Sequence, residues 1–190
     1  MKIIRAFIPL SLFLFIVAGC YIETDVFLTP QDELYLSNMI ISIDSGGGPE
    51  IIESSIRHSL NVIGLRDAFD ISKYAPPGSS TGDYIQLKPT HEIQIKKDSA
   101  YGDKISITSI EGGGKKLEWQ FEPRTQDFSS RLDGSKPENL NKVFLIVRIS
   151  FPGQVDIANT SENDGPVYTW RITNAQMTKP FKIQAIYTAQ

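Results

Sequence analysis

The sequence has very few cysteines and histidines, the residues that form disulfides and most structural zinc sites. Its 190 residues include one cysteine and two histidines. A single cysteine excludes an intrachain disulfide, and this set does not supply the four ligands of a structural zinc site. A Gly-x-Ser-x-Gly spacing occurs at residues 78–82, but it falls in a Pro- and Gly-rich loop and not at the strand-to-helix turn of a nucleophile elbow. The spacing of a phosphate-binding P-loop is absent. We therefore expect no metal, no cofactor and no enzymatic activity.

The chain lacks an excess of positive charge and, after its first twenty residues, any long apolar run. Its 19 basic and 22 acidic residues give a net charge of −3. Residues 20–190 retain 17 basic and all 22 acidic residues, a net charge of −5. A mildly acidic chain with dispersed lysines does not have the clustered positive charge of a nucleic-acid-binding protein. No later run approaches the ~20 apolar residues needed to span a bilayer.

The amino terminus has the pattern of a secretory signal. Lys2 and Arg5 precede an apolar stretch at residues 6–17 that is too short to span a membrane. Its end, Val17-Ala18-Gly19-Cys20, resembles the lipobox of bacterial lipoproteins. That resemblance implies cleavage before Cys20, a diacylglycerol on its thiol, and an acylated new amino terminus. The alternative is an ordinary signal peptide that happens to end at a cysteine.

The leader therefore predicts both domain organisation and location. Residues 1–19 are predicted to be a lipoprotein signal peptide, and residues 20–190 a single domain of sufficient length for a sizeable core. We expect this domain to be held to a membrane through lipidated Cys20, on an extracytoplasmic face of the cell envelope.

Period-two alternation of apolar and polar residues dominates the rest of the chain. Pro49 starts the one predicted helix, and apolar residues follow at helical spacing as far as a glycine stop at Gly64. The predicted fold is α+β, a curved, mostly antiparallel sheet with one main helix packed on its apolar face. The predicted strands span residues 21–29, 34–43, 91–97, 104–110, 115–122, 143–151, 155–158, 167–172 and 181–188.

The layer between this helix and the sheet is the candidate ligand site. Ile52, Ile56 and Leu60 lie on the apolar stripe of the helix, and Trp119 lies on the apolar side of a strand. A tight fit between them would form a core, whereas a looser fit would leave a cavity suited to an acyl chain. The other members of the predicted layer are Ile51, Ile63, Phe121, Phe144 and Ile146.

Titratable residues offer only weak catalytic candidates. His58 falls opposite the apolar stripe of the helix and His91 opens a strand, so we interpret both as solvated side chains in preference to ligands or bases. Two pairs of acids are close in sequence, but charges at a helix start and ordinary surface explain them as well as acid–base work or calcium binding. These pairs are Glu50 with Glu53 and Asp67 with Asp70.

The carboxyl-terminal third carries a motif resemblance. Phe151-Pro152-Gly153-Gln154-Val155, then Asn159, then Gly165-Pro166-Val167-Tyr168-Thr169-Trp170, resembles the LppM-like bacterial lipoprotein domain family. The resemblance implies an α/β envelope domain that contacts lipids or glycolipids, and it implies no catalytic residues. The motif also has a structural interpretation, because Pro152 and Gly153 would end a strand while Trp170 packs at the end of the sheet.

These observations favour a non-enzymatic envelope lipoprotein that binds a lipid, a glycolipid or another envelope component. The alternative is an interaction or scaffold lipoprotein without a small-molecule site, which would meet an envelope protein through exposed sheet edges and the loop at residues 125–140. An enzyme is a third hypothesis, and it would depend on His58, His91 and Asp67.

Overall fold

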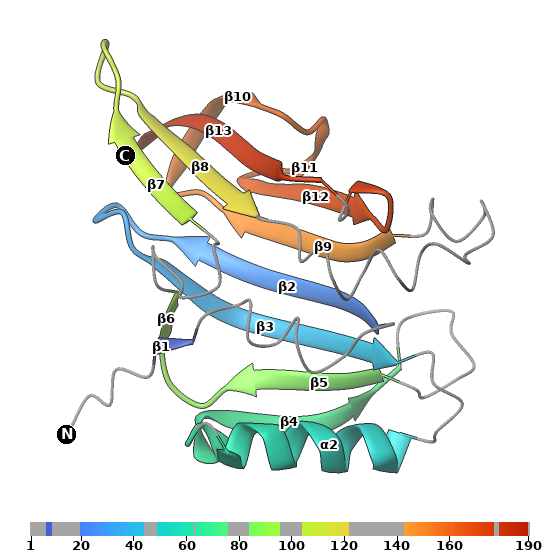
Figure 1. Ribbon diagram of the computed structural model, residues 1–190. Coiled ribbons are helices and arrows are strands. Elements are labelled where there is room, and N and C mark those ends of the chain that lie inside the picture. The colour runs from blue at the N-terminus through green and yellow to red at the C-terminus, as the bar shows by residue number, and fades with distance from the viewer. Residues whose placement is uncertain are drawn as a thin grey trace.

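The described part of the protein is built mainly from β-strands arranged in two sheets, with one α-helix (Figure 1). The computed structural model describes residues 7–8, 20–43, 49–62, 64–75, 84–95, 104–121, 143–176 and 179–189. The elements are β1 (Phe7–Ile8), β2 (Cys20–Leu28), β3 (Leu34–Ile43), α2 (Pro49–Val62), η1 (Arg66–Ala68), β4 (Phe69–Tyr74), β5 (Tyr84–Pro89), β6 (Ile93–Ile95), β7 (Lys104–Ser109), β8 (Lys115–Phe121), β9 (Val143–Ser150), β10 (Gly153–Ala158), β11 (Glu162–Asp164), β12 (Val167–Thr173) and β13 (Phe181–Ala189).

The larger sheet, called here the large sheet, has the strand order β1-β6-β3-β2-β9-β12-β11, and the β4–β5 hairpin joins it where β5 pairs with β3. Strand β2 runs antiparallel to β3 and parallel to β9. The small sheet has the order β10-β13-β8-β7, and its neighbouring strands are antiparallel. Strands of the two sheets therefore alternate along the chain: β7 and β8 of the small sheet lie between β6 and β9 of the large one, and β10 lies between β9 and β11.

Alternation along the strands separates an inner from an outer face of the large sheet. On β2, Ile22 and Val26 are buried on the inner face, while Tyr21 and Glu23 are half-buried on the outer face. Successive side chains point to opposite faces, so a strand with one buried face shows this pattern. Strand β9 lies between β2 and β12 and is buried more completely, since Ile146 on its outer face is also buried. Strand β9 is therefore a central strand, in keeping with its nearly continuous apolar sequence.

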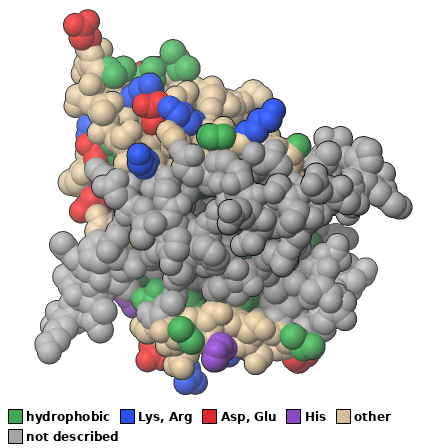
Figure 2. All heavy atoms as spheres, in the orientation of Figure 1, with side chains coloured by type: hydrophobic (Ala, Val, Ile, Leu, Met, Phe, Trp, Pro, Cys, Tyr) green, Lys and Arg blue, Asp and Glu red, His purple; other side chains and the backbone are tan. Residues whose placement is uncertain are grey.

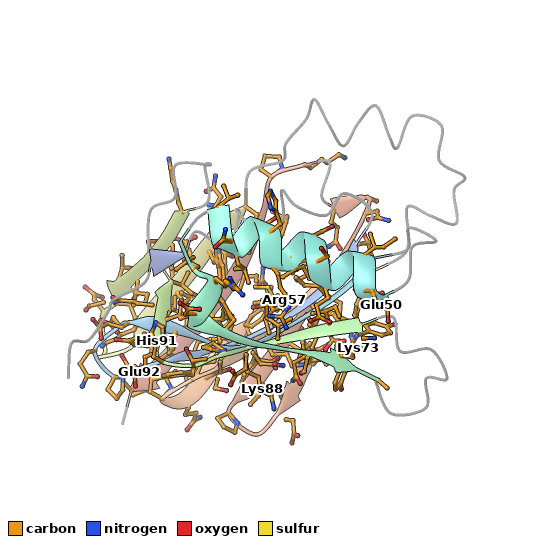
Figure 3. All side chains as sticks on the ribbon, turned by 90° about the horizontal axis from the view of Figure 1, so that it is seen from below. Glu50, Arg57, Lys73, Lys88, His91 and Glu92 are labelled. Atoms are coloured by element: carbon orange, nitrogen blue, oxygen red, sulfur yellow. The ribbon has the colours of Figure 1, made fainter. Side chains whose placement is uncertain are left out.

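Helix α2 begins at Pro49, as predicted, and its last turn is closed by glycine. Gly64 has a φ of 73°, a left-handed conformation that glycine adopts without strain, and the Leu65 amide donates a hydrogen bond to the Leu60 carbonyl at 2.8 Å. The helix buries Ile56 and Leu60, and it lies against the β4–β5 hairpin (Figure 3). Ile51 was predicted to face the sheet, but its side chain is exposed.

One continuous hydrophobic core joins the inner face of the large sheet, the small sheet and the helix. A polar contact fixes the small sheet to the β2–β3 turn. Asp32 in this turn has a φ of 63°, and its carboxylate accepts hydrogen bonds from the Lys115 ammonium at 2.6 Å and the Tyr187 hydroxyl at 3.2 Å. Burial and the adjacent Asp32 charge raise the pKa of Tyr187 above its usual value.

The predicted α+β architecture with a single curved sheet is wrong, because the structure is mostly β and has two sheets. The strands predicted between residues 91 and 122 are divided between the two sheets: β6 belongs to the large sheet, whereas β7 and β8 belong to the small one. The β4–β5 hairpin was not predicted, and the helix covers only this margin of the large sheet. Alternation reports which face of a strand is buried, not which sheet it joins.

Strand β1 lies in the predicted signal peptide and pairs in parallel with β6 at the margin of the large sheet. Among the residues described, no helix has the length and apolar character needed to cross a bilayer.

Candidate functional site

The predicted ligand-site residues that the structure describes lie in the continuous core, but in different parts of it: Ile56 and Leu60 on α2, which contacts β5, and Trp119 on β8 of the small sheet. Ile56, Leu60 and Trp119 are at most 1% exposed and belong to the same core cluster. The side chain of Ile52 lies outside the described residues, as do those of Phe144 and Ile63. Ile146 was predicted to face the helix, but it points to the outer face of the large sheet, in register with Glu23 and Arg171.

Two buried polar atoms in the described part of the chain have no hydrogen-bond partner. They are the hydroxyl oxygen of Thr24 on β2 and the indole nitrogen of Trp119 on β8. Thr24 is fully buried, and alternation along β2 places its side chain on the same inner face as those of Ile22 and Val26. A buried polar group without a partner costs about 1–3 kcal/mol, so native proteins have few of them.

The surroundings of Trp119 are strongly aromatic. Its ring stacks on Phe121 with centroids 5.0 Å apart, and Phe121 stacks on Phe181 at 4.5 Å. Burial is expected both of a packed core and of the wall of an enclosed binding site. Only the indole N–H, which has no hydrogen-bond partner, distinguishes Trp119 from a tryptophan that serves packing alone. Trp170, for comparison, donates its indole N–H to the Asn159 side-chain oxygen at 2.8 Å.

The outer face of the large sheet carries a polar network that sequence analysis did not identify. Arg148 on β9 contacts Glu23 at 2.6 Å and Asp25 at 3.0 Å, both on β2. Asp25 also accepts a hydrogen bond from the Asn38 amide at 2.9 Å, and Gln86 donates to the Asn38 carbonyl oxygen at 2.8 Å. The network therefore crosses four strands, from β9 through β2 and β3 to β5.

The charges in this network are held by their mutual contacts. Burial lowers the pKa of Arg148, but the hydrogen bonds to Glu23 and Asp25 raise it by more, so the net shift is upward. Burial raises the pKa of the Tyr21 hydroxyl, which also donates a hydrogen bond to Glu23. Each charge of Arg148, Glu23 and Asp25 has a partner, and these contacts join β9 to β2 on the outer face of the sheet.

Asn159, part of the carboxyl-terminal motif, connects the two sheets. Its side-chain oxygen accepts hydrogen bonds from the Trp170 indole N–H on β12 and from the backbone N–H of Gln184 on β13, each at 2.8 Å. Its side-chain nitrogen donates to the Lys182 carbonyl at 2.7 Å. The motif residues Asn159 and Trp170 therefore hold the fold together, in agreement with the structural interpretation of the motif.

Replacing Asn159 with alanine is expected to lower the free energy of unfolding by about 2–3 kcal/mol, because three hydrogen bonds are lost and the buried Trp170 indole is left unpaired. Urea titration followed by circular dichroism measures the change. Asn61→Ala, at an exposed helical position, is the control and should stay within about 0.5 kcal/mol of the wild type. Equal effects of the two substitutions would contradict the connecting role of Asn159.

The titratable candidates are scattered over the surface. His58 is exposed on α2, and His91 is exposed in the bend before β6, where its ring nitrogen lies 3.0 Å from the Thr90 hydroxyl. Glu50 pairs with Lys73, and Glu53 pairs with Arg57. In the part of the chain that the structure describes, no three His, Cys, Asp or Glu side chains gather as a metal site requires. In the view of Figure 2, acidic and basic side chains are interspersed over the described surface.

Cys20, the predicted lipidation site, is the first residue of β2 and pairs with Ile43 at the end of β3. Its side chain lies outside the described residues. Because the backbone of Cys20 is already part of β2, no linker separates the predicted anchor from a central strand of the large sheet.

Comparisons with known proteins give only distant structural matches. No protein-family model and no curated protein matches the sequence. Among solved structures, the folded domain of LppM from Mycobacterium tuberculosis, determined by NMR, matches over 92% of each chain with 13% identity and a TM-score of 0.44. LppM gives its name to the family that the carboxyl-terminal motif resembles. A similarity at this level transfers no residue role or activity to this chain.

Proposed function

We propose that this chain is a non-enzymatic lipoprotein of the bacterial envelope, anchored through Cys20, that binds a lipid or glycolipid. Its anchor is supported by the Val17-Ala18-Gly19-Cys20 sequence and by the position of Cys20 at the start of β2. Its ligand would lie between α2 and the inner faces of the two sheets. The proposal depends most on the unpartnered polar atoms of Thr24 and Trp119 in this apolar layer.

The chemistry of the layer fits an amphipathic ligand. Aliphatic side chains such as Ile56 and Leu60, together with the stacked aromatic rings beside Trp119, would contact acyl chains. The Thr24 hydroxyl and the Trp119 indole would bond to ester, hydroxyl or glycosidic oxygens. Such ligands are held by mostly apolar walls with a few polar groups that fix their orientation.

Two conservative substitutions test this proposal. Thr24→Val and Trp119→Phe remove the unpartnered polar groups but largely keep the shape of the side chains. Each should reduce the lipid that native mass spectrometry detects with the protein purified from membranes. Thr24→Val should also raise the free energy of unfolding of the lipid-stripped protein by roughly 1 kcal/mol, since a buried hydroxyl without a partner is removed.

The control is Thr108→Val, the same change at an exposed position on β7, which should leave both measurements unchanged. Wild-type protein that carries no lipid, or variants that keep their lipid at the wild-type level, would argue against a ligand in this layer.

An interaction lipoprotein is the second candidate, and the edge of the small sheet favours it. Among the described strands, β10 lies at one edge of this sheet, and Ile157 on β10 is 63% exposed next to a register shift. Exposed apolar side chains on an edge strand suit pairing with another protein. Pull-down from solubilised envelope with wild type and Ile157→Lys distinguishes the candidates: a stoichiometric protein lost in the variant favours an interaction role. The loop at residues 125–140, also suggested by the sequence, lies outside the described residues.

A further inference from the structure

One end of the large sheet, called here the Cys20 edge, gathers several strand ends around the predicted anchor. Strands β2, β5 and β9 begin at this edge, and β3, β4 and β12 end there (Figure 1). The pairing of Cys20 with Ile43 and of Val143 with Thr173 places these residues at the same edge. An attachment of Cys20 to a membrane would therefore also fix the position of this whole edge.

Three tyrosines lie in one row across the Cys20 edge. Tyr21 pairs with Ser42, Ser42 with Tyr84, and Tyr84 with Tyr74. Residues in register on neighbouring strands share a face, so all three tyrosines lie on the outer face, and all are half-buried. The rings of Tyr21 and Tyr84 meet edge to face with centroids 6.4 Å apart.

The helix begins at the same edge. The Glu50 carboxylate in its first turn pairs with the Lys73 ammonium at 2.5 Å, one residue before Tyr74. Figure 3 shows Glu50 and Lys73 together at one end of the molecule and His91 with Glu92 at the other. The next helical residue, Ile51, is 63% exposed although it is a large apolar side chain. Tyrosines and an exposed isoleucine are thus concentrated next to the anchor residue.

We propose that the Cys20 edge rests in the headgroup layer of the bilayer, with Tyr21, Tyr74, Tyr84 and Ile51 as its contact residues. This inference rests on the proposed acylation of Cys20. Because Cys20 is itself the first strand residue, acyl chains on it hold the edge at the membrane surface without a spacer. Tyrosine suits this layer, since its ring prefers an apolar setting and its hydroxyl a wet one. The strands then run away from the membrane, and the β2–β3 turn lies at the far end.

The single cysteine makes a sharp test possible, because in the acylated protein an introduced cysteine is the only free thiol. Full-length acylated protein is labelled with a fluorescent maleimide and reconstituted into phosphatidylcholine vesicles that contain a nitroxide-headgroup lipid. Tyr74→Cys is compared with Asp70→Cys, on the same strand and face but about 13 Å further from the edge. Ile51→Cys is compared with Val62→Cys, two exposed positions about 16 Å apart along α2.

We expect the nitroxide to quench the labels at positions 51 and 74 roughly twofold or more, and those at positions 62 and 70 very little, because the headgroup layer is only about 5–8 Å deep. Equal quenching within both pairs, or stronger quenching at positions 62 and 70, would overturn the inference. Flotation of the same vesicles separates this result from the proposed function. Protein that does not float lacks its anchor, whereas protein that floats without the quenching difference is anchored but does not rest on this edge.

Discussion

Replacing Cys20 with serine is expected to abolish the incorporation of radioactive palmitate into this protein. The hydroxyl of serine cannot take the place of the thiol to which the proposed lipid would be attached. Each buried methylene contributes about 0.8 kcal/mol to membrane binding, and one acyl chain alone anchors only marginally. The two or three chains implied by the lipobox would hold the domain almost permanently, so the Cys20 sulfur would determine where the protein is found.

The matched control keeps one thiol in the chain but moves it. In the double variant with Cys20→Ser and Asp70→Cys, the cysteine lies at an exposed position on β4, outside the lipobox. This variant should also remain unlabelled, which would show that the position and not the thiol alone directs acylation. Wild-type protein that incorporates no palmitate and fractionates with the cytosol would refute both the lipobox assignment and the proposed envelope function.

The strands near the amino terminus could be predicted closely because their periodicity is strong. Strand β3 was predicted at residues 34–43 and is observed there, and β2 differs from its prediction by one residue at each end. On β8, Leu117 and Trp119 are buried while Glu118 is half-buried on the other face, as the alternation predicted. Local patterns succeed here because one-sided burial imposes a period of two on the side chains.

The partition of strands between two sheets could not be predicted, because it depends on contacts between distant segments. Strands β2 and β9 are separated by more than a hundred residues yet pair in parallel, and β10 joins β13 while the following strands return to the large sheet. The β4–β5 hairpin was missed for another reason. Its first strand directly follows the short turn of helix at Arg66–Ala68, and its alternation is weak, since Asp70, Ser72 and Lys73 are all exposed.

The candidate site was predictable only in its apolar part. Helical spacing correctly placed Ile56 and Leu60 in the core. Thr24 was missed, although strict alternation along β2 gives it the inward parity of Ile22 and Val26, and that parity was the available signal. The contact of Arg148 with two β2 carboxylates depends on the register of β9, which no local pattern contains.

Replacing Leu60 with alanine is expected to lower the free energy of unfolding by about 2–5 kcal/mol. Leu60 lies on the buried face of α2 and belongs to the core cluster, so truncation of its side chain removes buried methyl groups and leaves a cavity. Ile51→Ala on the same helix is the matched control. Its side chain is already exposed, and the change should stay within about 0.5 kcal/mol. Chemical denaturation of the lipid-stripped protein measures both.

The same pair of variants connects stability to the proposed ligand. If an acyl chain packs beside Leu60, the protein purified with its lipid should be more stable than the stripped protein, because a ligand that binds only the native state stabilises it. Leu60→Ala should weaken this added stabilisation, whereas Ile51→Ala should leave it intact, since Ile51 points away from the layer. A lipid-dependent gain that is identical in wild type and Leu60→Ala would place the ligand elsewhere on the protein, and a Leu60→Ala cost near zero would remove Leu60 from the packed core.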